Sequence, residues 1–563
     1  MTSGDAVLSL LLRRTGLVSD AQVAAALATD RSDGSGIVDV LVKSGAVRED
    51  AFLQKIAPLL GLSYTEMAVI EPDAEALKLL PARAVYQYAV MPLKLEGGVL
   101  TVAISDPFNA GVSDGLRLAA GRPVRLTLAP REDIRKANRK YYGVGAEAVE
   151  KMIEDGRYEV DAGTASISKI DVNEMGQEAS IVRFVNQIIA EADRQGATDI
   201  HVEPMESELR IRYRIDGILH RVDVPPQLNR LKSAVISRLK VMANMDIAEK
   251  RMPMDGRIGI RLNGEDIDIR VSTMPTIYGE SVSLRLLQKS GSFVKLADLG
   301  LNPHDRHAVE KIINRPNGIF LVTGPTGSGK TTSLYSFLHE INSVDVRILT
   351  AEDPIEYEMA GINQVHVKQD IGLPFARILR SFLRQDPDII MVGEIRDGET
   401  AEIAINASLT GHLVFSTLHT NDAAGSFARL TDMGAEPFLI ASAVAAVMAQ
   451  RLVRRVCPVC NRLEPLDRAL WDIPGEPASD RVPHAVGCEK CAMTGYRGRR
   501  GIFELLQVTE PIESLVINRR PAGEIKLKAI EQGMLTLRQD GWTKVFQGMT
   551  TVEEIFRVTE END

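Results

Sequence analysis

One glycine-rich stretch has the residue types and spacing that bind a nucleotide's phosphates, namely Gly324-Pro325-Thr326-Gly327-Ser328-Gly329-Lys330-Thr331-Thr332. Its glycines let the backbone wrap closely round phosphates, Lys330 can reach the β and γ oxygens, and the Thr331 hydroxyl suits Mg²⁺. The apolar run 319–322 predicts a buried strand before it, and apolar residues at helical spacing over 334–341 predict a helix after it. Unpaired N–H groups and the helix dipole then converge on one point. The stretch therefore predicts a nucleotide-binding P-loop.

Two carboxylates follow predicted strands further along the chain. Glu352 comes after the strand 346–350, and Glu394 comes after the buried strand 388–392 and a glycine. Four apolar residues followed by a glycine and an acid fit a Walker B strand, whose carboxylate lies beside Mg²⁺ or its water shell. Both acids are therefore candidate catalytic residues.

Two histidines bracket the next predicted strand, 413–416. His412 begins this strand and His419 follows its end. Either side chain could sense the γ-phosphate, and a structural hydrogen-bonding role is an equally good explanation for each. Alternating strands and helices predict a parallel sheet with its nucleotide at the carboxyl ends of the strands.

The chain's four cysteines form two C-x-x-C pairs, Cys457/Cys460 and Cys488/Cys491. Four thiolates in two knuckles suit a tetrahedral, structural Zn²⁺. A dithiol redox pair is the rival interpretation, but it needs only one such motif. Because 461–487 separate the pairs, we expect a loop or subdomain between them.

Arginines line one face of a sheet predicted within 180–290. The run 209–215 alternates strictly, with apolar residues on one face and Arg210, Arg212 and Arg214 on the other. A solvated arginine face is one interpretation. The alternative is that some arginines of this domain reach phosphates, since NTPases that act in rings often take an arginine from another domain or subunit.

These motifs lie in a chain of 563 residues, too long for a single core. The composition is that of a globular protein, and the net charge of −10 provides no electrostatic case for nucleic acid. No apolar run approaches the length of a membrane-spanning helix, and no basic region opens the chain. We expect a cytoplasmic protein without a signal peptide.

The front of the chain predicts a docking domain. Residues 1–141 contain a weak repeat of helical hairpins and then alternate helix and strand, with the clearest strand at 99–104. Over 142–179 apolar periodicity fades, which predicts a flexible linker. The remaining predicted domains are an antiparallel sheet domain, a core that holds the P-loop, a zinc module and a helical region, at 180–290, 291–456, 457–506 and 507–563.

Residues 180–563 closely resemble the type II secretion ATPases, the E component, and their relatives in type IV pilus assembly. The resemblance is carried by the P-loop and by 348–357, 383–397 and 410–420, which look like the family's Asp box, Walker B and His box, followed by the cysteines. It implies an α/β multidomain fold: a RecA-like P-loop NTPase core, a preceding antiparallel α+β (PAS-like) domain and an inserted tetracysteine zinc module. Residues 407–412 and 432–438 look more like the secretion branch.

The resemblance also implies a hexamer that hydrolyses ATP with Mg²⁺ at subunit interfaces and moves an inner-membrane platform to extrude a pseudopilus. By analogy Glu394 handles Mg²⁺ and Glu352 orients or activates the attacking water. Arg257, Arg270 and Arg285 match the positions that reach the γ-phosphate, which would leave Arg210, Arg212 and Arg214 as the solvated face.

The front resembles the domain that binds cyclic di-GMP in some relatives only faintly, since its Arg-Leu-Gly opening is missing at 7–9 and 36–38. We therefore favour docking to the cytoplasmic part of a bitopic membrane protein, peripheral to the inner membrane, over dinucleotide binding. A pilus extension motor and a nucleotide-gated scaffold without fast turnover are the competing functions, and no nucleic acid partner is expected.

Overall fold

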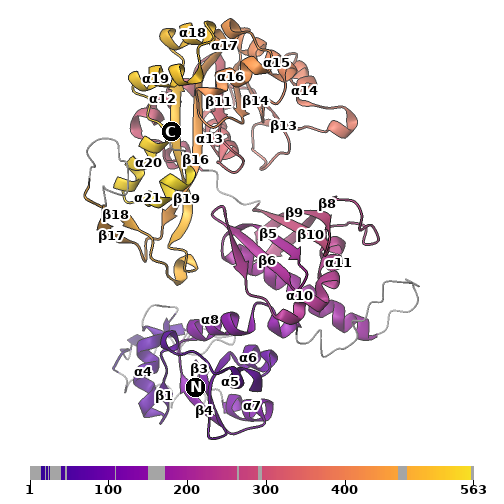
Figure 1. The fold of residues 1–563 in the computed structure, drawn as a ribbon, viewed down its shortest axis with the longest axis vertical. Helices are drawn as coiled ribbons and strands as arrows, with labels where there is room; N and C mark the ends of the chain where they lie inside the picture. Colours follow the sequence, from indigo (N-terminus) through magenta and orange to yellow (C-terminus); the bar gives the residue numbers. More distant parts are fainter. Residues whose placement is uncertain are drawn as a thin grey trace. The chain divides into compact units, whose positions relative to one another are not determined.

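The computed structural model describes residues 47–107, 110–149, 172–262, 265–288, 294–466 and 479–559, with scattered positions between 14 and 44. The chain divides into two compact units. The first comprises Met1–Leu262 and Ile267–Leu286, and the second comprises Asn263–Asp266 and Leu287–Asp563 (Figure 1). The predicted α/β class is confirmed, and each unit is described by itself.

The front of the first unit holds a four-stranded sheet in the order β1-β4-β3-β2. The β2–β3 pair is antiparallel, whereas β4 pairs in parallel with both β3 and β1. The strand predicted at 99–104 is confirmed as β3. The strands and the helices packed on them are β1 (Ser63–Tyr64), β2 (Val90–Glu96), β3 (Val99–Ile104), β4 (Val124–Leu128), α4 (Glu49–Leu59), α5 (Ala74–Leu79), α6 (Ala82–Tyr88), α7 (Ala110–Ala120) and α8 (Arg131–Tyr142). Most of the predicted hairpin repeat lies outside the described residues.

The predicted linker is wrong at both of its ends. Directly after α8, the Val144 N–H donates to the Asp223 carbonyl over 2.8 Å, and Val149 is buried in the core of the following domain. Gly145 has a φ of +74°, and a Cβ there would lie 2.4 Å from the Phe184 ring, so the close approach requires glycine. At the other end, helix α10 already begins at Val172. The part of the predicted linker between these two ends, 150–171, lies outside the described residues.

The predicted sheet domain contains six strands in the order β7-β6-β5-β10-β9-β8. Each pair whose register is described, β5–β6, β6–β7 and β5–β10, is antiparallel, as predicted. Its elements are β5 (Ala197–Pro204), β6 (Leu209–Ile215), β7 (Ile218–Val222), β8 (Met254–Leu262), β9 (Glu265–Thr276), β10 (Gly279–Gln288), α10 (Val172–Arg194) and α11 (Lys232–Met242).

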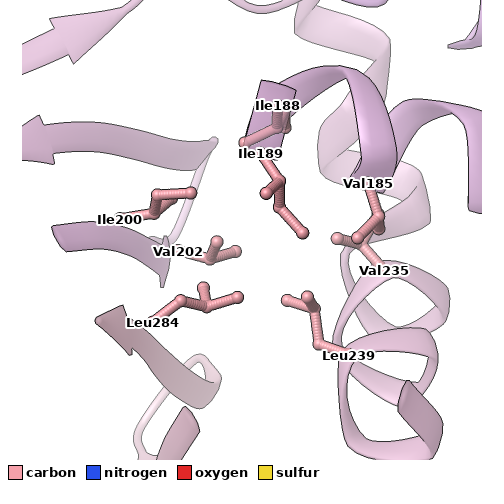
Figure 2. Close-up of a pocket in the computed structure, with 8 residues that line it drawn as sticks. All are labelled: Val185, Ile188, Ile189, Ile200, Val202, Val235, Leu239 and Leu284. Atoms are coloured by element: carbon pink, nitrogen blue, oxygen red, sulfur yellow. The ribbon is translucent and has the colours of Figure 1, made fainter. Parts of the chain in front are cut away.

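Helices α10 and α11 cover one face of this sheet. Figure 2 shows the space between them and strands β5 and β10, lined by apolar side chains. Val185, Ile188 and Ile189 point into it from α10 because their spacing places them on one helix face. The cavity there is about 10 Å³, which is too small for a ligand, so it is part of the hydrophobic core.

The second unit is built on a seven-stranded sheet in the order β13-β12-β14-β15-β11-β16-β19. All neighbours pair in parallel except β16 and β19, which are antiparallel. Alternate residues of β11 enter two cores: Ile319 and Leu321 face one, and Phe320 and Val322 face the other. Helices therefore cover both faces, which explains the uninterrupted apolar run in this strand.

The strands of this sheet are β11 (Gly318–Thr323), β12 (Ile348–Glu352), β13 (Asn363–His366), β14 (Ile389–Val392), β15 (Leu413–Leu418), β16 (Val444–Val456) and β19 (Tyr496–Gln507). The helices are α12 (Pro303–Ile313), α13 (Lys330–Ile341), α14 (Phe375–Phe382), α15 (Gly398–Leu409), α16 (Gly425–Asp432), α17 (Pro437–Ala443), α18 (Glu510–Ile517), α19 (Ala522–Glu531), α20 (Leu537–Phe546) and α21 (Val552–Val558). The last four form the predicted helical region.

The cysteine region lies between β16 and β19. It contains an antiparallel pair, β17 (Arg462–Pro465) and β18 (Arg481–His484). The predicted boundary at 506 is wrong, because β19 already pairs with β16 along most of its length and belongs to the main sheet. Among the described residues, no helix combines the length and the apolarity needed to cross a membrane.

Candidate nucleotide-hydrolysis site

The P-loop connects the carboxyl end of β11 to the first residue of α13, as predicted. Gly324, Gly327 and Gly329 have φ angles of +144°, +81° and +90°, a region that favours glycine. A Cβ at Gly324 would lie 2.5 Å from the Gln450 carbonyl oxygen. Lys330 Nζ donates to the Gly324 and Pro325 carbonyls at 2.9 and 3.1 Å, and burial lowers its pKa. The loop thus has the backbone shape and the ammonium group that a phosphate chain needs.

Gln450 supports the P-loop from the neighbouring strand β16. Its Nε2 donates to the Ser328 carbonyl over 2.8 Å, and its Oε1 accepts from the Ser333 hydroxyl over 2.8 Å. The side chain is buried and therefore holds the loop to the start of α13. Sequence reasoning missed this residue, although a glutamine that interrupts the apolar run 444–449 was an available signal.

Glu352 lies at the carboxyl end of β12, where the sequence predicted it, and only 3% of it is exposed. Its Oε2 accepts a hydrogen bond from the Tyr335 hydroxyl on α13. Its Oε1 accepts from Thr350 Oγ1 at 2.6 Å and from Gln364 Nε2 at 3.0 Å. Burial, followed by the Glu352 carboxylate, raises the pKa of Tyr335, so its hydroxyl stays protonated and donates. The carboxylate is therefore held in one orientation from three sides.

Glu394 follows β14 and lies beside His419, which follows β15. His419 Nε2 lies 3.2 Å from Glu394 Oε2, and Arg396 pairs with the other carboxylate oxygen. Burial alone would raise the pKa of Glu394, but Arg396 and His419 outweigh it and hold the pKa below its ordinary value. Glu394 is therefore ionised at neutral pH and suited to a cation. The structure brings the two predicted residues together.

His412 does not lie at this edge of the sheet. It precedes β15, and its backbone carbonyl accepts from the Gly318 N–H, at the amino end of the parallel strand β11. Six residues of β11 separate this end from the P-loop, about 20 Å at ~3.3 Å per residue. Its Nδ1 lies 2.8 Å from the Ala407 carbonyl. The γ-phosphate role predicted for His412 is therefore wrong for the P-loop of its own chain, and the structural role fits.

The strand arginines singled out from the sequence lie on the face opposite the helices, because each alternates with buried apolar residues. Arg257 on β8 and Arg285 on β10 are exposed, and Arg270 on β9 is half-buried. Arg285 Nε donates to Asp199 Oδ1 over 3.0 Å. These three predicted residues thus share one face of the first unit.

Arg210, Arg212 and Arg214 are not simply solvated, contrary to the prediction. Arg210 and Arg212 both pair with the Glu203 carboxylate, and Arg214 Nε lies 3.7 Å from Asp199 Oδ2. Each is only about a third exposed. Cross-strand partners of opposite charge hold these side chains on the sheet.

The four cysteine sulfurs, Cys457, Cys460, Cys488 and Cys491, all lie within 4.8 Å of one another. The separations between Cys457 and Cys488, Cys460 and Cys491, and Cys488 and Cys491 are 3.7, 3.8 and 3.8 Å. Tetrahedral Zn²⁺ with Zn–S bonds of ~2.3 Å requires S···S distances of about 3.8 Å. The backbone N–H groups of Cys488 and Gly495 donate to the Cys491 sulfur over 3.1 and 3.2 Å, and such contacts favour a thiolate. The residues therefore fit this metal.

A P-loop at the carboxyl edge of a parallel sheet, with two acids at neighbouring strand ends, defines a P-loop nucleotide hydrolase. The family model described as type II/IV secretion system protein matches residues 174–557, more than half of the chain. The chain therefore belongs to this family, which confirms the resemblance predicted from the sequence. A second model, the MshEN domain, matches residues 60–148.

The chain is similar to proteins named for type II secretion and to proteins named for type IV pilus assembly. The type II secretion system ATPase E of Vibrio cholerae is 50% identical over 400 residues, which cover 70% of this chain and 78% of that protein. The type II secretion system protein E of Xanthomonas campestris is 40% identical over 568 residues, 99% of this chain and 98% of that protein. The type IV pilus assembly ATPase PilB of Myxococcus xanthus is 42% identical over 552 residues, 97% of each.

Proposed function

We propose that this protein hydrolyses ATP to drive pseudopilus assembly and protein export by a type II secretion system. The observation that carries the hydrolysis is the placement of two oriented carboxylates, Glu352 at the carboxyl end of β12 and Glu394 just beyond that of its neighbour β14, in the same parallel sheet as the P-loop strand β11. The names of the relatives support the process. The sequence features at 407–412 and 432–438 favour secretion over a pilus extension motor, which is the alternative.

Each residue has a defined task in this proposal. The P-loop glycines and Lys330 bind the phosphates, and the Thr331 hydroxyl with Glu394 suits Mg²⁺, which would neutralise charge on the phosphate oxygens. Glu352, held by its three hydrogen bonds, orients or deprotonates the attacking water. His419 fixes Glu394 through its Nε2.

The remaining parts complete the proposal. Arg257, Arg270 and Arg285 provide positive charge to the nucleotide of a neighbouring subunit in a hexamer. The four cysteines hold a structural Zn²⁺, which would cross-link the segments before and after β17 and β18. The front docks on a bitopic protein and a platform of the inner membrane and places the motor at the cytoplasmic side. We propose no nucleic acid partner, because the net charge is −10. For the front we favour docking over cyclic di-GMP binding, because the Arg-Leu-Gly opening expected for that ligand is missing from the sequence.

The hydrolysis proposal is tested with Glu394→Gln. This change removes the charge of the carboxylate at nearly constant shape, so we expect phosphate release to fall at least a hundredfold while binding of a fluorescent ATP analogue persists. Glu399→Gln is the matched control, because Glu399 lies nearby on α15 as an exposed partner of Arg380 and should not affect turnover. Normal hydrolysis by Glu394→Gln would refute the Walker B assignment.

Affinity capture from membranes distinguishes the client machines. Recovery of type II secretion platform proteins is expected, and recovery of pilus platform proteins alone would establish the alternative. A wild-type protein that binds ATP but turns over slowly, even with its membrane partner, would instead indicate a nucleotide-gated scaffold.

A further inference from the structure

The loop between β15 and α16, residues 419–424, is held by side chains from several distant elements. The Thr420 N–H donates to Thr323 Oγ1 on β11 over 2.9 Å, and their hydroxyl oxygens lie 2.6 Å apart. Arg451 on β16 donates from Nη2 to the Asn421 carbonyl over 2.8 Å. A loop at a sheet edge ordinarily has more freedom, so this degree of fixation indicates that its position matters.

A buried cluster of charged side chains also holds this loop in place. Glu504 on β19 is fully buried, and its Oε1 accepts the Ala423 N–H over 2.9 Å. Lys526 on α19 places its Nζ 3.9 Å from Glu504 Oε2 and 3.8 Å from Asp422 Oδ2. A buried carboxylate is costly unless it is paired and hydrogen-bonded, and here these interactions go to the loop and to Lys526.

The same loop begins with His419, whose imidazole contacts Glu394. We propose that Glu504 and Lys526 are positioning residues for hydrolysis, because they hold the loop that brings His419 to Glu394. The inference rests on the proposed ATPase function. It connects helix α19, which packs beside α16, to the orientation of the Walker B carboxylate.

Glu504→Gln keeps an acceptor for the Ala423 N–H but replaces a charge-assisted hydrogen bond with a weaker neutral one. Lys526→Met removes the ammonium group while preserving side-chain length, and it is the second variant in case Glu504→Gln does not fold. We expect each to lower kcat about tenfold with a KM for ATP within about twofold. A misplacement of about 1 Å can cost roughly a hundredfold, and the loop keeps its contacts with Thr323 and Arg451 in both variants, so the smaller effect is expected. Lys528→Met is the matched control, since Lys528 on the same helix makes only a surface pair with Glu531.

A double-mutant cycle separates positioning from general stability. If Glu504 acts through the loop, then Glu504→Gln should have no further effect on kcat once His419→Ala is present, and binding of labelled ADP should be normal in all variants. Additive losses, or a lower melting temperature with unchanged kcat per folded molecule, would overturn the inference. A wild-type protein without ATP hydrolysis would instead refute the proposed function, so the two failures are distinguishable.

Discussion

Tyr335→Phe should lower turnover without weakening nucleotide binding. The change deletes a single hydroxyl, which donates to Glu352 from the helix that follows the P-loop. The ring stays in its buried position, edge-on to Tyr357 with the ring centroids 6.0 Å apart. Lys330 and the P-loop backbone are not touched by the substitution.

The magnitude follows from the donors that remain. A hydrogen bond to a charged group contributes about 1.5–3 kcal/mol. Since Thr350 and Gln364 still donate to Glu352, we take the lower figure. If the free energy that favours the oriented Glu352 carboxylate falls by about 1.5 kcal/mol, the population of that orientation falls roughly tenfold, and kcat should fall by the same factor.

The assay is steady-state phosphate release over a range of ATP concentrations, with nucleotide affinity measured separately by fluorescence. Tyr496→Phe is the matched control, because its hydroxyl lies 2.9 Å from Thr551 Oγ1 in the same unit, in a neutral pair away from the P-loop. An unchanged kcat would show that Tyr335 does not orient Glu352. A raised kcat would show that Tyr335 restrains Glu352 in an unproductive orientation.

Three further predictions concern other parts of the molecule. Arg396→Ala should raise the pKa of Glu394, because the Arg396 guanidinium helps hold that pKa below its ordinary value of 4.5. The lowered pKa stabilises the folded state at pH values above 4.5, and this stabilisation is lost as the pH falls through the pKa of the folded state. In the variant Glu394 is protonated at a higher pH, so the acid limb of the pH–rate profile should move to higher pH. Cys457→Ser should abolish stoichiometric zinc, measured by atomic absorption, and lower the melting temperature, whereas retained metal would exclude the tetracysteine site. Lys240→Met should destabilise the first unit by about 3–5 kcal/mol in urea unfolding, because it leaves Glu280 buried without its ammonium partner, and Lys240→Met with Glu280→Gln should recover part of this loss.

Much of the local structure was predictable because it depends on nearby residues. The strict alternation of 209–215 predicted β6 with its bounds, since a strand exposes successive side chains on opposite faces. The P-loop strand, turn and helix were likewise readable from a single stretch. The polarity of a parallel strand would even have separated the two histidines, since His412 precedes β15 and His419 follows it.

The linker shows where local reasoning failed. Residues 143–149 contain two closely spaced glycines and open the segment 142–179, in which apolar periodicity fades, and this pattern predicts flexibility. Their order comes from a different part of the chain, since Asp223 accepts from Val144 and Phe184 packs on Gly145. Composition contains no information about such partners.

The sequence by itself determined that this chain binds a nucleotide, which acids follow its strands, and that its cysteines suit a tetrahedral metal. Those conclusions need only residue type and short spacing. The tertiary structure decided which groups orient those acids: Tyr335 and Glu352 are 17 positions apart, and Glu504 lies 81 from Ala423. Such pairs form only when the sheet and the helices on its faces bring distant parts of the chain together. A hydrogen bond depends on the positions of its two atoms in space and not on their separation along the chain.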